Sequence, residues 1–281
     1  MQSKKRGISG RLYLVITALL WSVNGFLIKS VTWSGLNVAI VRGMVGALVI
    51  LFILRKRLPI RFTPRKVATA VCHCMQGLLY VISIKYTTAA NAVVLQNTSL
   101  LYIVLVTAIV TRTKPRRRDL IACFVMLGGI VLTAAGNMGG GGMIGNGLAM
   151  ISAMFYAGVF FFGSGLGEES EDAVLIGYFL FYLLSPLLIG SPDLVNAVPM
   201  DWVLVVLDGI LISFAWLLFA KGIKTTPALE ANFITLLEPV LSPVWTFLFL
   251  QEKMTVTSLL GCAVVILTLI VYNARQAKPD I

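Results

Sequence analysis

Ten long apolar segments, separated by short polar loops, constrain this chain more than any other feature. Each is close to the roughly 20 residues that an α-helix needs to cross about 30 Å of hydrocarbon. Of the 281 residues, 58% are hydrophobic and only 12% are charged, whereas soluble domains carry about 25% charged residues. An ordinary soluble enzyme, a disordered protein and a disulfide scaffold are therefore excluded. We predict an all-α polytopic membrane protein with ten transmembrane helices, at approximately 12–31, 36–54, 67–85, 89–111, 119–136, 146–166, 173–190, 202–222, 229–250 and 257–274.

The basic residues predict the orientation of these helices, because Lys and Arg are enriched in cytoplasmic loops. With the N-terminus in the cytoplasm, 19 of the 23 Lys and Arg residues fall on the cytoplasmic side. We therefore expect a multi-pass protein of the inner (plasma) membrane with both termini cytoplasmic. The net charge of +11 then needs no nucleic-acid partner. One predicted inner segment, 167–172, is acidic, but acidic residues have little effect on topology.

The second half of the sequence repeats the first. Shifts of 139 and 135 residues align several pairs of identical residues, among them Lys85 with Lys224, Thr87 with Thr226, Cys123 with Cys262 and Gly10 with Gly145. Each half contains five predicted helices, and because five is odd the second half must enter the membrane from the opposite side. We predict two inverted five-helix repeats, residues 1–138 and 139–281. This is an architecture of secondary transporters, in which one repeat rocks against the other around a site near the midplane.

Short motifs in both halves resemble those of a known family. They are Leu20-Trp21-Ser22, Val41-Arg42-Gly43, Leu237-Glu238-Pro239, Gln251-Glu252-Lys253 and Gly261. Over essentially its whole length the chain is similar to the drug/metabolite transporter superfamily, specifically its EamA-type members. The resemblance implies a ten-span secondary transporter of amino acids, amines, nucleobases, drugs or sugar derivatives, and leaves both the substrate and the direction, import or export, open. The first half departs from the pattern, with Ser99-Leu100 in place of Glu-Pro and Ala122 in place of Gly.

Glu238 is the most prominent ionisable residue inside a predicted span. A charge at the centre of a membrane helix costs about 2.5–3.5 kcal/mol on insertion scales, so its presence needs a reason. Pro239 removes a backbone donor beside it and predicts a kink in the helix; broken helices are a feature of transporter binding sites. Thr235 and Ser242 share its helical face, which we expect to line a cavity. Glu238 would bind a cationic amine or carry a coupling proton there; a structural carboxylate bonded to a neighbouring helix is the alternative.

Arg42 and Asp208 lie at similar depths in the second and eighth predicted spans. Ionisable residues inside membranes usually pair with one another or mark a substrate pathway. Both interpretations stay open for Arg42: an ion pair with Asp208 that holds helices together, or a contact with the substrate.

Further polar and aromatic residues predict a central aqueous cavity. Each alone is more often a contact between helices than a ligand, but together they provide hydrogen-bonding groups and aromatic faces that suit cations and rings. With Glu238, Thr235, Ser242, Arg42 and Asp208, the candidate substrate-binding residues are Trp21, Asn24, Gln76, Tyr80, Asn97, Tyr102, Tyr156 and Trp216.

Two other classes of function remain as alternatives: an intramembrane enzyme, and a channel or scaffold. An enzyme would need a converging nucleophile and base or metal ligands, and His73 is the chain's single histidine. Cys72-His73-Cys74 does not form a metal site, because consecutive helical residues point about 100° apart. We expect no cofactor or metal and no catalytic residue.

The expected partners follow from the transport hypothesis. They are a small-molecule substrate, the lipid bilayer, and a coupling proton or exchanged solute. The fifth and tenth spans are almost entirely aliphatic. We expect them to lie outside the cavity, facing lipid or a second copy in a homodimer.

Overall fold

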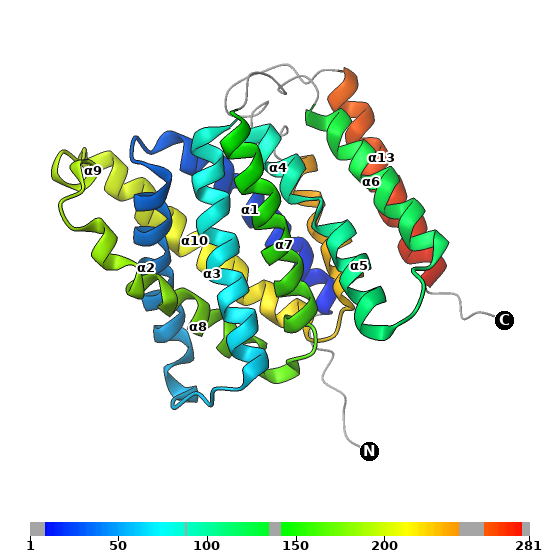
Figure 1. Cartoon of the computed structure of the whole chain (residues 1–281), viewed down its shortest axis with the longest axis horizontal. Helices are drawn as coiled ribbons and strands as arrows, with labels where there is room; N and C mark the ends of the chain where they lie inside the picture. The colour runs from blue at the N-terminus through cyan, green and yellow to red at the C-terminus, as the bar shows by residue number, and fades with distance from the viewer. Residues whose placement is uncertain (1–8, 88, 135–141, 242–255, 277–281) are drawn as a thin grey trace.

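The computed structural model describes residues 9–87, 89–134, 142–241 and 256–276, and this described part is helical throughout, without a strand (Figure 1). The first half of the chain contains α1 (Gly10–Ser30), α2 (Gly35–Leu54), α3 (Pro64–Tyr86), α4 (Ala89–Gln96), α5 (Ser99–Thr111) and α6 (Arg117–Ala134). The second half contains α7 (Met143–Gly163), α8 (Ser170–Leu183), α9 (Pro192–Val195), α10 (Pro199–Ile223), α11 (Ala228–Thr235) and α13 (Val256–Gln276). Short 3₁₀ turns are η1 (Arg55–Arg57), η2 (Gly167–Glu169) and η3 (Ser185–Leu188).

Helix lies in each of the ten segments predicted from the sequence, but the helices differ in length. Among the described residues, five stretches are long and apolar enough to cross a membrane: Gly10–Ser30, Gly35–Arg57, Pro64–Tyr86, Met143–Gly163 and Pro199–Ile223. Others are shorter, such as α8 with 14 residues. The all-helical fold is confirmed, whereas the number of ten spans stays a prediction.

Two of the predicted spans are broken helices, and the breaks lie at equivalent positions of the repeat. The segment predicted as one span at 89–111 is interrupted at Asn97 and Thr98, between α4 and α5. In the second half, α11 ends at Thr235, Leu236 forms a turn, and residues 237–241 are again helical. A shift of 139 residues superposes Asn97 on Leu236. The helix is therefore interrupted on the N-terminal side of Glu238, next to the residue beside which a kink was predicted.

The two halves of the chain interleave. The helix α1 packs along α10, and α7 packs along α3, so the first predicted span of each half contacts the third predicted span of the other half. The same exchange brings α2 against α10 and α3 against α8. Glycines make the closest contacts: a Cβ on Gly10 would lie 2.9 Å from the Gly222 carbonyl oxygen, and one on Gly145 would lie 2.6 Å from the Tyr86 carbonyl carbon.

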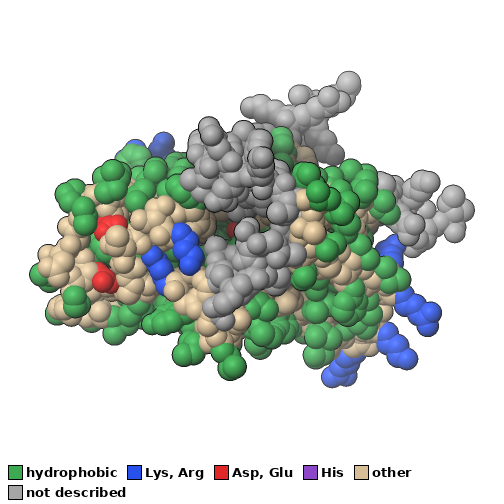
Figure 2. All heavy atoms as spheres, turned by 90° about the horizontal axis from the view of Figure 1, so that it is seen from above, with side chains coloured by type: hydrophobic (Ala, Val, Ile, Leu, Met, Phe, Trp, Pro, Cys, Tyr) green, Lys and Arg blue, Asp and Glu red, His purple; other side chains and the backbone are tan. Residues whose placement is uncertain are grey.

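The helices α6 and α13 lie side by side at one edge and run in opposite directions (Figure 1). They are the last helices of the two predicted repeats, and inverted repeats require this opposite course. Large apolar side chains on their outer surfaces are exposed, including Phe124 at 63% and Leu267 at 61%. Viewed from the upper end of Figure 1, hydrophobic side chains also gather along much of the lower edge of the molecule (Figure 2). This surface suits lipid; a second copy at α6 and α13 stays a prediction.

Ion pairs join the two halves at the lower end of Figure 1 and explain the acidic segment 167–172. Glu171, buried at the start of α8, pairs with Arg57 at 2.8 Å and with Lys224 at 3.1 Å. Asp172 pairs with Lys66 at 3.1 Å. The acidic residues thus neutralise basic residues that the sequence placed on the same side of the membrane.

Candidate functional site

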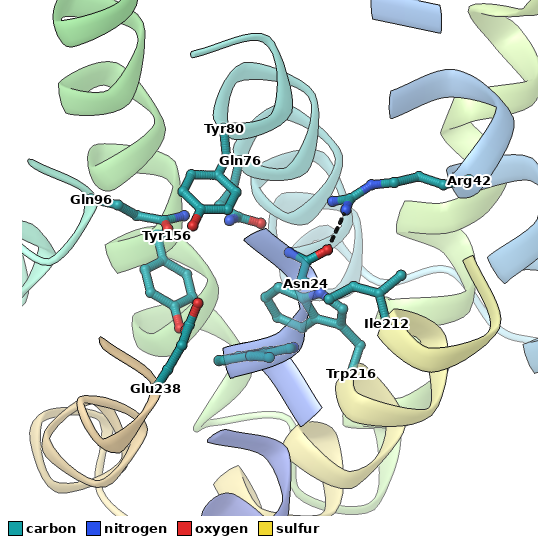
Figure 3. Close-up of a pocket in the computed structure, with 10 residues that line it drawn as sticks. Asn24, Arg42, Gln76, Tyr80, Gln96, Tyr156, Ile212, Trp216 and Glu238 are labelled. Atoms are coloured by element: carbon teal, nitrogen blue, oxygen red, sulfur yellow. Dashed lines mark hydrogen bonds between the residues drawn. The ribbon is translucent and has the colours of Figure 1, made fainter. Parts of the chain in front are cut away.

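A central pocket lies between the two halves and encloses about 300 Å³ of empty space, including the part open to solvent (Figure 3). Both members of the α1–α10 and α3–α7 pairs contribute to its wall, as do α2, α4 and the helical residues after the break at Leu236. The lining residues are Trp21, Asn24, Arg42, Gln76, Tyr80, Gln96, Tyr156, Ile212, Trp216 and Glu238.

Glu238 enters the pocket from the helical residues that follow the break. Figure 3 shows its side chain on the same side of the pocket as the Tyr156 ring, across from Arg42. Thr235, at the break, donates its side-chain hydroxyl to the Asn232 carbonyl one turn earlier in the same helix, at 2.8 Å. Within the described part of the chain no Lys or Arg forms an ion pair with Glu238. A carboxylate without a counter-ion can accept a proton or a cation from a ligand.

Arg42 lies across the pocket and is held by two partners. Its Nη1 donates to Asn24 Oδ1 at 2.9 Å (Figure 3) and to Asp208 Oδ2 at 3.0 Å. Both members of the ion pair are buried, with side-chain exposures of 7% for Arg42 and 2% for Asp208. The ion pair, one of the two interpretations that the sequence left open for Arg42, is therefore present. Asp208 stands behind Arg42 rather than in the pocket wall.

Aromatic rings form one wall of the pocket. Trp21 lies with its ring centroid 4.9 Å from that of Trp216 and 6.0 Å from that of Tyr156. The indole N–H of Trp21 and the Oε1 of Gln76 are buried without a hydrogen-bond partner among the described residues. The wall therefore combines faces that attract cations or rings with polar atoms that have no partner among the described residues.

Eight of the predicted binding residues line the pocket: Trp21, Asn24, Arg42, Gln76, Tyr80, Tyr156, Trp216 and Glu238. The remaining described candidates have other positions. Asn97 lies at the break between α4 and α5 and donates to the Val93 carbonyl at 2.8 Å. Tyr102 packs against the apolar core. Asp208 and Thr235 bond to Arg42 and Asn232, and Ser242 lies outside the described residues.

Gln96 and Ile212 line the pocket but were not among the predicted residues. Gln96 is adjacent to Asn97, and the helix ends there, so the break directs Gln96 rather than Asn97 toward the pocket. The polar run around Asn97 could have identified it. Ile212 is an aliphatic residue in an apolar span, and the sequence carries no signal that separates it from its neighbours.

The fold and the pocket together define a helical membrane protein of the transporter class, with a polar site between two interleaved repeats. The chain belongs to the EamA-like transporter family, which matches residues 8–135 and again residues 143–274. The resemblance to the drug/metabolite transporter superfamily is thereby confirmed, and the chain is a multi-pass membrane protein built from two EamA repeats. Since the family is one of transporters, membership favours transport over the intramembrane enzyme.

Comparison with solved structures supports the same fold. Twenty-nine chains match. One, described only as "Crystal structure of protein", has a TM-score of 0.77 and 18% sequence identity, covering 96% of this chain and 99% of its own. At this identity the likeness concerns the fold alone. No curated protein matches the sequence.

Proposed function

We propose that the protein is a secondary active transporter of small polar or amphipathic metabolites, among which we favour compounds with a cationic group. Substrate would bind in the central pocket, and the pocket would open alternately to the two sides of the membrane. Family membership and the two broken helices beside the pocket support this proposal.

The observation that carries the proposal is the position of Glu238. It lines the pocket directly after a helix break and has no Lys or Arg partner among the described residues. A partly buried carboxylate without a partner is costly. A cationic substrate group or a proton bound there would remove this cost, and the adjacent aromatic wall would add cation–π attraction.

Flux into proteoliposomes tests the function directly. The purified full chain is reconstituted, and flux is measured for a panel of amino acids, amines and nucleobases. Each compound is supplied either outside or inside the liposomes. The proposal predicts saturable flux that is selective within the panel. Flux that rises linearly with concentration would indicate a channel, and the absence of flux for every compound would count against transport of these classes. The preferred direction, import or export, is read from the same experiment.

The Glu238→Gln variant tests whether the carboxylate carries the coupling proton. If it does, the pH dependence of flux seen in the wild type should disappear in this variant. Glu169→Gln is the matched control, because Glu169 is half exposed and is not among the residues that line the pocket. An unchanged pH profile in Glu238→Gln would refute proton coupling through this residue.

A further inference from the structure

The two ends of the pocket differ in how their charges are balanced. Arg42 already has its counter-ion, because Asp208 lies 3.0 Å from its Nη1 and both side chains are buried. Glu238 has no such partner among the described residues. Among the described residues, the pocket wall together with Asp208 therefore contains one cation and two carboxylates, and the surplus negative charge belongs to Glu238.

Hydrogen-bond donors nevertheless remain at the Arg42 end. A guanidinium carries five N–H donors, and the bonds that Arg42 makes within the described part of the chain use only Nη1. Trp21, a further residue of the pocket wall and 4% exposed, has an indole N–H without a partner among the described residues. Both residues line the same pocket. A ligand oxygen that reached this end would meet donors that have no other acceptor.

We propose that the Arg42 end of the pocket is a subsite for a neutral hydrogen-bond acceptor, and that Asp208 determines this specificity by excluding a carboxylate. The substrate class is then a monocation whose ammonium binds Glu238 and whose carbonyl, amide or hydroxyl oxygen binds Arg42 and Trp21. This inference rests on the proposed function, since it assumes that Glu238 takes the cationic group.

The exclusion of carboxylates follows from charge neutrality in a buried site. A ligand carboxylate beside Arg42 would share that one cation with Asp208, so one of the two negative charges would lack a counter-charge. Burying an uncompensated charge costs several kcal/mol even after relaxation. A carbonyl or hydroxyl oxygen can accept the same N–H bonds without adding charge, and it leaves the Arg42–Asp208 pair intact.

Matched ligands test the subsite on the purified full chain. For chain lengths of about four to six carbons, each set contains an ω-amino amide, the ω-amino acid and the plain alkylamine, and affinities are measured by isothermal titration calorimetry. The length series is needed so that the ammonium and the oxygen can reach opposite ends of the pocket. At the best length we expect the amide to bind about tenfold tighter than the alkylamine, as one hydrogen bond to a charged group implies, and tighter than the amino acid. An amino acid that binds as tightly as the amide, or an amide with no advantage over the alkylamine, would overturn the proposal.

Two variants separate this specificity from a general loss of folding. Asp208→Asn frees the charge of Arg42, so the amino acid should now bind more tightly than the amide; an unchanged order would contradict the role of Asp208. Trp21→Phe keeps the ring and removes only the N–H, so it should reduce the advantage of the amide and leave the alkylamine unaffected. An equal loss for both ligands would overturn the assignment of Trp21.

The same measurements distinguish a failure of the proposed function from a failure of this inference. If Glu238→Gln does not weaken the alkylamine, the cation site itself is wrong. If the alkylamine depends on Glu238 but the amide has no advantage, the transporter proposal stands and the acceptor subsite is refuted.

Discussion

At the scale of single residues, Arg42 shows how a charge is accommodated inside the membrane. Its depth in an apolar segment predicted a partner, and Asp208 is that partner. The contribution of Asn24, which holds the same Nη1, was not predictable, because it depends on how α1 and α2 are rotated against each other. The pair leaves Glu238 as the carboxylate that a ligand can neutralise.

Removing one member of this pair should be more damaging than removing both. Asp208→Ala leaves Arg42 buried without its counter-ion, and we expect a loss of about 3–5 kcal/mol in the free energy of unfolding. The double variant Arg42→Met with Asp208→Leu should be much closer to the wild type, because apolar replacements of a buried pair are often neutral. Denaturant unfolding in detergent compares them; equal losses for the two variants would contradict a buried ion pair.

Asp193 lies in the short helix α9 between two predicted spans, and we predict that its contacts are sensitive to acid. It accepts hydrogen bonds from the backbone N–H of Ser34 at 2.8 Å and from Asn37 Nδ2 at 2.6 Å. The Ser34 backbone bond is the main cause that holds the pKa of Asp193 below its usual value. A carboxyl with a lowered folded-state pKa stabilises the protein above its unfolded pKa of about 3.9 and loses this contribution as the pH falls through the folded value.

The prediction is a pH-dependent difference in melting temperature between the wild type and Asp193→Asn. The difference should be present near neutral pH and should shrink as the pH falls below about 4. A difference that does not vary with pH would show that the ionised carboxylate does not stabilise this contact.

At the scale of helices, the two breaks show what the sequence could and could not predict. Pro239 indicated the second break, because proline cannot donate a backbone hydrogen bond. The first break has no proline; instead Asn97 and Thr98 donate from their side chains to the Val93 and Leu95 carbonyls at 2.8 and 2.6 Å. Such bonds compete with the helical ladder, but polar residues in a span are equally compatible with an intact helix. The alignment of Asn97 with Leu236 in the repeat is the sequence feature that could have indicated the first break.

Two glycines of α7 give a matched test of helix packing. A Cβ on Gly145 would lie 2.6 Å from the Tyr86 carbonyl carbon and 2.7 Å from the Thr87 backbone nitrogen, and backbone atoms cannot move aside easily. Gly147 has open space around the same position. We expect Gly145→Ala to lower stability by about 1–3 kcal/mol through overpacking and Gly147→Ala to leave it unchanged or raise it slightly. Thermal unfolding measures both; similar behaviour of the two variants would contradict the close packing of α7 on α3.

At the scale of the whole molecule, the sequence predicted two repeats but not the way they interleave. Five helices per half and the shift of 139 residues are properties of the sequence alone. The packing of α1 on α10 and of α7 on α3 joins residues far apart in the chain, and a single sequence contains no direct record of such contacts. For the same reason the pocket residues were recognised by polarity, whereas Ile212 was missed.

Orientation in the membrane is a prediction that belongs to this scale. Lys56 lies beside the ion pairs of the lower end, and Asn196 follows α9 near the opposite end; both are exposed. In a background without the native cysteines, a membrane-impermeant maleimide should label Asn196→Cys in intact cells and Lys56→Cys only after permeabilisation. The reverse pattern would overturn the cytoplasmic placement of the termini.

The central claim is that Glu238 provides the cation site of the pocket, and equilibrium binding of a primary alkylamine tests it most directly. Titration calorimetry compares the wild type with Glu238→Gln and with the control Glu169→Gln. Since a side chain without a negative charge can no longer pair with an ammonium, the account predicts that Glu238→Gln weakens binding by at least about tenfold, while Glu169→Gln binds like the wild type. Equal affinity of Glu238→Gln and wild type would contradict the account.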